Sequence, residues 1–259
     1  FLFRHVECVH SELREAVDDI LHACRAAFGS HLKCVILKGS ALKGDFVRNY
    51  SDLDLHAFVD PETLTADRAP NIDYALRFQE AIGSLDPRSV GASQFQIYFV
   101  RSDRPAAGWT PSVPGSYEVV YGEIPPALTS WKDFDFRTHV RSALAKVGED
   151  RRLLIERIID KPNKALPSFV RLAGTYVKNH AYSAALLASE DPEWTFSLPR
   201  DQLAKYLNGV DRSLAAIGQF FSVITDWAEV ERNPKAARAA FRKAIEALDA
   251  LEAWAQSQP

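Results

Sequence analysis

Residues 35–59, VILKGSALKGDFVRNYSDLDLHAFV, constrain the fold of this chain more than any other segment. A hydrophobic run ends in Gly39 and Ser40, and a second run carries Asp52 and Asp54. Because residues two apart in a β-strand point to the same face, both carboxylates are expected on one side, with the leucines beside them in the core. The segment therefore predicts a strand, a polar turn and a second strand that carries two acids on one face.

The acid pair is a candidate metal site. Two carboxylates one pleat apart attract a divalent cation, and Mg²⁺ prefers oxygen ligands. Proteins usually hold Mg²⁺ with one or two carboxylates together with the phosphate oxygens of a substrate. Asp52 and Asp54 are therefore the candidate metal ligands and catalytic residues, and the pattern favours nucleotide chemistry over a stand-alone metal cage.

The Gly-Ser turn is a candidate phosphate-binding site. Gly39 allows close approach of the backbone, and a helix that begins at Ser40 presents unpaired N–H groups and a partial positive charge. We expect Ser40, the amides beside it and Lys43 to hold the terminal phosphates of a nucleoside triphosphate, with Ser51 as a further nucleotide-binding residue. Either half of the pattern alone has a plainer reading, because a Gly-Ser pair is often only a turn and Asp-x-Asp is often a solvated strand end.

The two halves together form a more specific pattern. A strand, Gly39-Ser40, about a dozen further residues and then Asp52 and Asp54 in a second strand resemble the signature of nucleotidyltransferases of the DNA polymerase beta superfamily. The resemblance implies a mixed β-sheet flanked by helices and two metal-binding Asp residues that hold Mg²⁺. It also implies transfer of a nucleoside monophosphate from a nucleoside triphosphate, with ATP the expected co-substrate and pyrophosphate the leaving group.

The third carboxylate of that family is missing where it is expected. The family usually carries it on a later strand, and the one good candidate here is residues 93–100, SQFQIYFV, whose polar positions are Gln94 and Gln96. An amide oxygen accepts a hydrogen bond or weakly binds a cation, but it does not take a proton from an attacking hydroxyl at neutral pH.

Three explanations for the missing acid stay open. In the first, the base comes from the other domain, as in the kanamycin-type nucleotidyltransferases that the chain resembles in layout. In the second, the enzyme works with two acids and a polarised substrate hydroxyl. In the third, the domain binds a nucleotide or a partner and no longer catalyses transfer. Under the first explanation the candidates are Glu118, Glu123, Asp133 and Asp135, although acids of this kind are more often ordinary surface charges.

The order of expected elements indicates an α+β chain in two parts. We expect a nucleotidyltransferase domain over residues 1–124 and a C-terminal all-α helical bundle over residues 125–259. Apolar residues recur at helical spacing over residues 4–28 and 74–82, which should cover the sheet. The remaining expectations for the first part are a polar loop at 61–70 and strands at 93–100 and 117–121. The expected helices of the second part are 134–147, 151–159, 165–188, 200–207, 214–230 and 234–255.

One expected helix of the second part carries a cationic face. Arg171 and Lys178 are two helical turns apart and so share a face, which would neutralise the β- and γ-phosphates of a bound nucleotide. Tyr176 or Tyr182 would stack on the base. His180 is expected to be a capping or surface residue.

Composition limits the partners. The chain has 259 residues and a formal charge of −3, and this mild acidity argues against a long nucleic acid as acceptor, since phosphate contacts demand basic surfaces. Cys8, Cys24 and Cys34 lack metal-ligand spacing and are odd in number, which is typical of reduced core cysteines in a cytoplasmic protein. No apolar run approaches the length of a membrane span.

The sequence thus predicts a cytoplasmic, Mg²⁺-dependent nucleotidyltransferase whose acceptor is a small hydroxylated molecule such as an aminoglycoside. One alternative is a catalytically impaired module that binds a nucleotide or a partner protein. Another is a transferase of the toxin–antitoxin type that modifies a protein or a tRNA end.

Overall fold

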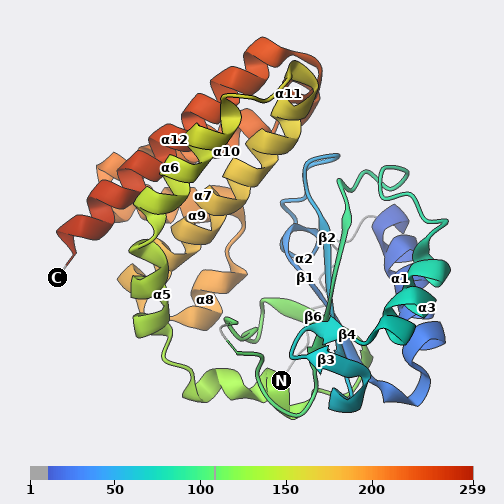
Figure 1. Cartoon of the computed structure of the whole chain (residues 1–259). Coiled ribbons are helices and arrows are strands. Elements are labelled where there is room, and N and C mark those ends of the chain that lie inside the picture. Colours follow the sequence, from blue (N-terminus) through green and yellow to red (C-terminus); the bar gives the residue numbers. More distant parts are fainter. Residues whose placement is uncertain (1–10, 108, 259) are drawn as a thin grey trace. The chain divides into compact units, whose positions relative to one another are not determined.

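The computed structural model describes residues 11–107 and 109–258, which form two compact units. The first unit spans Phe1–Phe134 and contains the β-sheet, and the second spans Asp135–Pro259 and is mostly helical (Figure 1). An α+β chain with a mixed sheet followed by a helical region is therefore confirmed. The division falls after Phe134, later than the boundary at residue 124 expected from the sequence.

The main sheet has four strands in the order β5-β2-β1-β6. Strand β1 pairs antiparallel with β2 and with β6, whereas β2 pairs parallel with β5, so the sheet is mixed. The strands expected at 93–100 and 117–121 are confirmed, with bounds that differ by one or two residues. The strand bounds are β1 Leu32–Lys38, β2 Leu53–Val59, β5 Phe95–Arg101 and β6 Tyr117–Gly122.

Two helices cover one face of this sheet. Helix α1, Ser11–Phe28, and helix α3, Ile72–Ile82, pack against each other and over this face (Figure 1). Phe28 joins the helices to the sheet, because its ring stacks 5.0 Å from that of Tyr74 and 4.7 Å from that of Phe99. The helix expected at 74–82 is thus confirmed. Residues 4–10 of the other expected helix lie outside the described residues.

The opposite face carries a second, smaller apolar cluster. Cys34, Ile36 and Phe58 of the sheet are buried there beneath Ala127 and Leu128. These last two residues belong to the short helix α4, Pro126–Thr129, which is followed by the turn η3, Ser130–Asp133. Because α4 packs on the sheet, the chain up to Phe134 belongs to the first unit.

The cysteines within the described residues are core residues, as expected. Cys24 and Cys34 are buried and unpaired, and burial raises the pKa of their thiols to about 12 and about 11. Both are therefore uncharged at neutral pH. Cys8 lies outside the described residues.

The segment expected as a polar loop at 61–70 is structured, so that prediction was wrong. It forms the turn η2, Pro61–Thr63, and a small hairpin of β3, Leu64–Ala66, and β4, Ala69–Pro70. Strands of three and two residues are too short for an alternating pattern to reveal in a sequence. The four-residue helix α2, Ser40–Lys43, follows β1.

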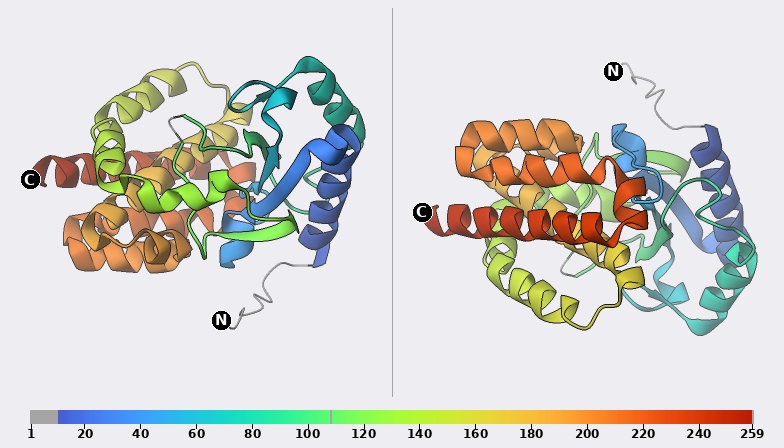
Figure 2. Two further views of the ribbon diagram at one scale, coloured as in Figure 1. Left: turned by 90° about the horizontal axis from the view of Figure 1, so that it is seen from below. Right: turned by 90° about the horizontal axis from the view of Figure 1, so that it is seen from above.

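The second unit contains only helices and turns among its described residues. Helices α7 and α12 have 24 residues each and pack against each other, and α12 extends along the unit (Figure 2, red). The helix bounds are α5 Phe136–Leu144, α6 Val147–Ile158, α7 Leu166–Ser189, α8 Pro192–Ser197, α9 Arg200–Val210, α10 Ala215–Ile224, α11 Trp227–Arg232 and α12 Pro234–Ser257.

Two helical expectations need correction. The helix expected over 214–230 is broken between α10 and α11, at Thr225 and Asp226. Helix α8 was not expected, although Asp191 caps it by accepting a hydrogen bond of 3.0 Å from the Trp194 amide and Pro192 opens its first turn. Among the described residues, no helix has the length and apolar character needed to cross a bilayer.

Candidate functional site

The strand register places the predicted acids in a row of side chains that crosses the sheet. Asp54 on β2 lies opposite Lys38 on β1 and beside Gln96 on β5, while Lys38 also lies opposite Tyr117 on β6. Register partners share a face of the sheet, and directly opposite side chains are close neighbours. Gln96, Asp54, Lys38 and Tyr117 therefore form one continuous row.

The two acids lie on the face away from α1 and α3. Leu53 and Leu55 are fully buried and belong to the core beneath those helices, so the half-buried Asp52 and Asp54 point the other way. This is the arrangement that the alternation of residues predicts.

Asp52 accepts hydrogen bonds from the two residues that precede β5. The Ser93 hydroxyl donates a hydrogen bond to Oδ1 of Asp52, and Nε2 of Gln94 donates one to Oδ2 at 3.1 Å. Gln94 thus acts here as a donor that orients an acid.

The Gly-Ser turn lies directly against the second acid. Gly39 has φ +76° and ψ −154°, a region that is essentially restricted to glycine. A Cβ at this position would lie 2.2 Å from Oδ2 of Asp54, so a side chain would displace the carboxylate. Ser40 follows, half-buried, as the first residue of α2, and the half-buried Lys43 is its last.

Ser51 holds the loop that leads to the acids. It is buried, its hydroxyl accepts a hydrogen bond of 2.9 Å from the Val47 amide, and its own amide donates one of 2.8 Å to the Val47 carbonyl. Its carbonyl accepts a further bond, of 2.9 Å, from the Ser93 amide. The contacts of Ser51 are therefore those of a residue that shapes the site from beneath.

Lys38 is a residue of this site that sequence reasoning missed. Its Nζ donates a hydrogen bond of 2.7 Å to the buried Ser112 hydroxyl, and its strand position puts it opposite Asp54. A signal was present, since a lysine stands between the apolar run at residues 34–37 and Gly39. A cation next to the acid pair offsets part of its negative charge.

In the next row of the sheet, His56 and Tyr98 carry aromatic rings. The ring of His56 stacks on Trp109 at 4.6 Å and meets the edge of Tyr98 at 5.5 Å. Burial lowers the pKa of His56 well below its ordinary value, and the charge of Lys38 lowers it further. His56 is therefore neutral at pH 7 and lies beside the acids as part of an aromatic wall.

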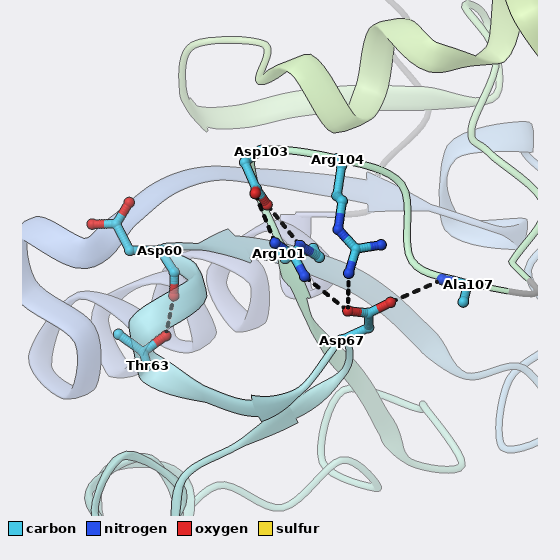
Figure 3. Close-up of polar contacts among 7 residues, drawn as sticks. All are labelled: Asp60, Thr63, Asp67, Arg101, Asp103, Arg104 and Ala107. Atoms are coloured by element: carbon cyan, nitrogen blue, oxygen red, sulfur yellow. Dashed lines mark hydrogen bonds and ion pairs between the residues drawn. The ribbon is translucent and has the colours of Figure 1, made fainter.

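The segment that brings Trp109 over this row is anchored by an ionic network (Figure 3). Asp67, in the β3–β4 turn, accepts hydrogen bonds from the Ala107 amide at 3.1 Å, Arg101 at 3.0 Å and Arg104 at 3.2 Å. The first two bonds in particular lower the pKa of Asp67. Arg101 also donates to both oxygens of Asp103, at 2.7 Å each.

The candidate bases fall at different places. Glu118 lies opposite Leu37, which is buried under the helices, so Glu118 is on the other face of the sheet from Asp54, and this removes it from the candidate bases. Glu123 follows β6 and Asp133 ends η3, both exposed. Asp135, in the second unit, caps α5 by accepting a 3.0 Å hydrogen bond from the Thr138 amide, which lowers its pKa.

The residues singled out on α7 belong to the second unit. Arg171 and Lys178 are half-buried. Tyr182 is buried, and its hydroxyl donates a hydrogen bond of 2.5 Å to the Leu198 carbonyl, so it is a core residue and its prediction as a base-stacking residue was wrong. Tyr176 is half-buried.

His180 is also buried, which corrects the expectation of a surface position. Its Nε2 lies 2.8 Å from Oδ2 of Asp150 on α6, so the pair links two helices. Burial lowers the pKa of His180, while the hydrogen bond to Asp150 opposes this shift.

The helical unit has a cavity of its own, of about 610 Å³. It lies among the ends of α5, α6, α7 and α12, and its charged lining residues are Arg141, Glu149, Arg152 and Glu252. Its volume is in the range of small-molecule sites. No sequence motif pointed to it.

No protein-family model matches this chain, and no curated protein does.

Proposed function

We propose that the chain is a Mg²⁺-dependent nucleotidyltransferase of the polymerase beta type, with a nucleotidyltransferase-type sheet and a C-terminal helical bundle. The observation that best supports this is the contact between the Gly-Ser turn and the acid pair. A Cβ on Gly39 would lie 2.2 Å from Oδ2 of Asp54, so two motifs 15 positions apart in the sequence meet at one point. A phosphate held at the turn would then be adjacent to a cation held by the acids.

The donor set fits Mg²⁺. Asp52 and Asp54 offer hard carboxylate oxygens, and the hydrogen bonds from Ser93 and Gln94 orient the first of them. When bound, Mg²⁺ would neutralise phosphate charge and orient the reacting oxygens.

The other residues of the site would bind the nucleotide. The Ser40 hydroxyl, the amides after Gly39 and the Lys43 ammonium would hold the β- and γ-phosphates of ATP. Lys38, in the row of Asp54, would add positive charge beside them. Lys178 on α7 remains a candidate phosphate ligand from the second unit.

The next question is which group takes the proton from the acceptor hydroxyl. Gln96 occupies the place in the row where a third acid would face Asp54, and His56, whose pKa is well below its ordinary value, is a poor base. The acceptor hydroxyl would therefore lose its proton to solvent while it is polarised in the site, at a reduced rate. The proposed acceptor is a small hydroxylated molecule such as an aminoglycoside, and the proposed location is cytoplasmic.

The same glutamine favours a second candidate function. A site with two acids and Gln96 beside them would bind a nucleotide or a partner protein without transfer. A transferase of the toxin–antitoxin type, acting on a protein or a tRNA end, differs from the first proposal only in its acceptor.

Pyrophosphate release from each of the four nucleoside triphosphates, with Mg²⁺ and a panel of aminoglycosides, tRNA and protein acceptors, tests the proposal. Asp52→Asn and Asp54→Asn should each abolish acceptor-dependent release and keep the far-ultraviolet circular dichroism spectrum. Asp18→Asn, an exposed position on α1, is the matched control and should remain active.

The outcomes separate the candidates. Full activity in either variant of the acid pair contradicts the proposal. If the unmodified chain releases no pyrophosphate with any acceptor but binds a nucleotide by calorimetry, the binding module is correct.

A further inference from the structure

Three metal-ligating side chains converge at the other end of the sheet from Asp54. His31 precedes β1 and Asp60 follows β2, and the two strands run antiparallel, so this end lies about 20 Å from the Lys38–Asp54 row. Nδ1 of His31 lies 3.2 Å from Oδ2 of Asp60 and 3.1 Å from Oε1 of Glu62. The three ligand atoms all lie within 4.8 Å of one another.

These separations suit a tetrahedral metal ion. Zn²⁺ binds nitrogen and oxygen ligands at about 2.0–2.2 Å, so neighbouring ligand atoms of a tetrahedral site are about 3.3 Å apart. The imidazole nitrogen has both carboxylates close to that separation. One ring nitrogen carries at most one proton, so it does not donate fully to two carboxylates at once. A cation in the same place would interact with all three groups.

The backbone already holds the ligands in position. The Asp60 amide donates a hydrogen bond of 3.0 Å to the His31 carbonyl. The Asp60 carbonyl accepts bonds from the Thr63 amide at 3.0 Å and from the buried Thr63 hydroxyl at 2.7 Å, the latter drawn in Figure 3. Pro61 restricts the backbone between Asp60 and Glu62. Little ordering of the chain is therefore needed for a metal ion to bind.

The ammonium group of Lys33 competes with a metal ion for the Asp60 carboxylate. Its Nζ lies 2.9 Å from Oδ2 of Asp60 and donates a hydrogen bond of 2.9 Å to the Ser30 carbonyl. The side chain is 42% exposed, so the ammonium can withdraw into solvent when a cation arrives. Glu62 is 72% exposed, which leaves room for water as a fourth ligand.

We propose that His31, Asp60 and Glu62 form a binding site for Zn²⁺, separate from the Asp52–Asp54 pair. One imidazole and two carboxylates are a ligand set that Zn²⁺ accepts, whereas Mg²⁺ favours all-oxygen sites that retain several waters. A bound ion would tie η2 to the start of β1 and so stabilise this end of the sheet.

Zinc titration by calorimetry tests the site. The full chain carrying Asp52→Asn and Asp54→Asn serves as the background, so that the other acid pair does not contribute. One Zn²⁺ should bind per chain, and His31→Ala or Glu62→Gln should weaken binding by at least about tenfold. His22→Ala removes an exposed histidine of α1 and is the matched control that should change nothing.

A change that strengthens binding makes the test more specific. Lys33→Gln removes the competing ammonium from Asp60 and should tighten Zn²⁺ binding. Co²⁺ substituted for Zn²⁺ should give the intense visible bands of a tetrahedral complex, and His31→Ala should remove them. Absence of Zn²⁺ binding, or equal affinity in the background and in its His31→Ala derivative, would overturn the proposal.

Discussion

Gly39→Ala is the most informative single substitution in this chain. Gly39 combines φ +76° and ψ −154° with a position where a Cβ would lie 2.2 Å from Oδ2 and 3.1 Å from Cγ of Asp54. The substitution therefore forces two changes at once, a strained backbone and a displaced catalytic candidate. We expect a clear loss of stability in the sheet.

The two costs are separable. Alanine in this backbone region costs about 1–3 kcal/mol. Moving the Asp54 carboxylate out of the contact requires a side-chain torsion away from its preferred value, which costs about 0.5–1.5 kcal/mol. The expected total is about 2–4 kcal/mol of opening free energy.

Native-state hydrogen exchange of the β1 and β2 amides measures this loss in the sheet unit alone, without a contribution from the helical unit. Gly29→Ala is the matched control, because Gly29 also has a positive φ, +53°, but nothing lies within 4 Å of its Cβ position. Gly29→Ala should lower the opening free energy by only about 1–2 kcal/mol.

A double-mutant cycle isolates the contact. Asp54→Ala removes the atoms at 2.2 and 3.1 Å and leaves its Cβ at 3.4 Å, an ordinary contact. In that background Gly39→Ala should cost less, by about 0.5–1.5 kcal/mol. Strictly additive effects of the two substitutions would refute the close contact and, with it, the main support for the proposed function.

Two further predictions concern Gln96 and His180. Gln96→Glu puts a carboxylate beside Asp54 in the register and should raise acceptor-dependent pyrophosphate release by up to roughly 100-fold. Gln94→Glu removes a hydrogen-bond donor to Asp52 and should lower this release. If Gln96→Glu gives no gain, the row of Asp54 and Gln96 does not face the reacting hydroxyl. Burial lowers the pKa of His180 in the folded chain, so the unfolded chain takes up this proton first as pH falls below about 6.5, and stability should drop from there until the folded-state pKa is reached. Urea unfolding followed by far-ultraviolet circular dichroism between about pH 7 and pH 5 should show this drop. His180→Gln should reduce the slope without removing it, because burial also lowers the pKa of His56 and of His139. An equal slope in both proteins would contradict the assignment.

Local periodicity accounts for what the sequence predicted correctly. The alternation of Leu53 and Leu55 with Asp52 and Asp54 places the acids on one face because a strand has a two-residue repeat, whatever it pairs with. The helix at 74–82 and the long α7 were predictable for the same reason, since their apolar residues recur every three or four positions.

The predictions that failed were those that depended on which helix or strand packs against another. Glu118 falls on the wrong face for a base because β6 pairs with β1 in a register that no local pattern reveals. His180 is buried between helices, and its Nε2 lies 2.8 Å from Oδ2 of Asp150 on α6, a contact across 30 positions that offsets the cost of burying the ring. The break between α10 and α11 likewise interrupts a continuous apolar repeat.

The sequence by itself determined the strand–turn–strand unit, the face that carries Asp52 and Asp54, and the helical character of the second half. Only the tertiary structure decided that Lys38 and Gln96 lie beside Asp54, that Gly39 touches this acid, and that His31 and Asp60 meet at the far end. Each of these follows from strand pairing, which joins residues distant in the chain. Propensity and periodicity act over a few residues, whereas register is set by the packing of the whole sheet.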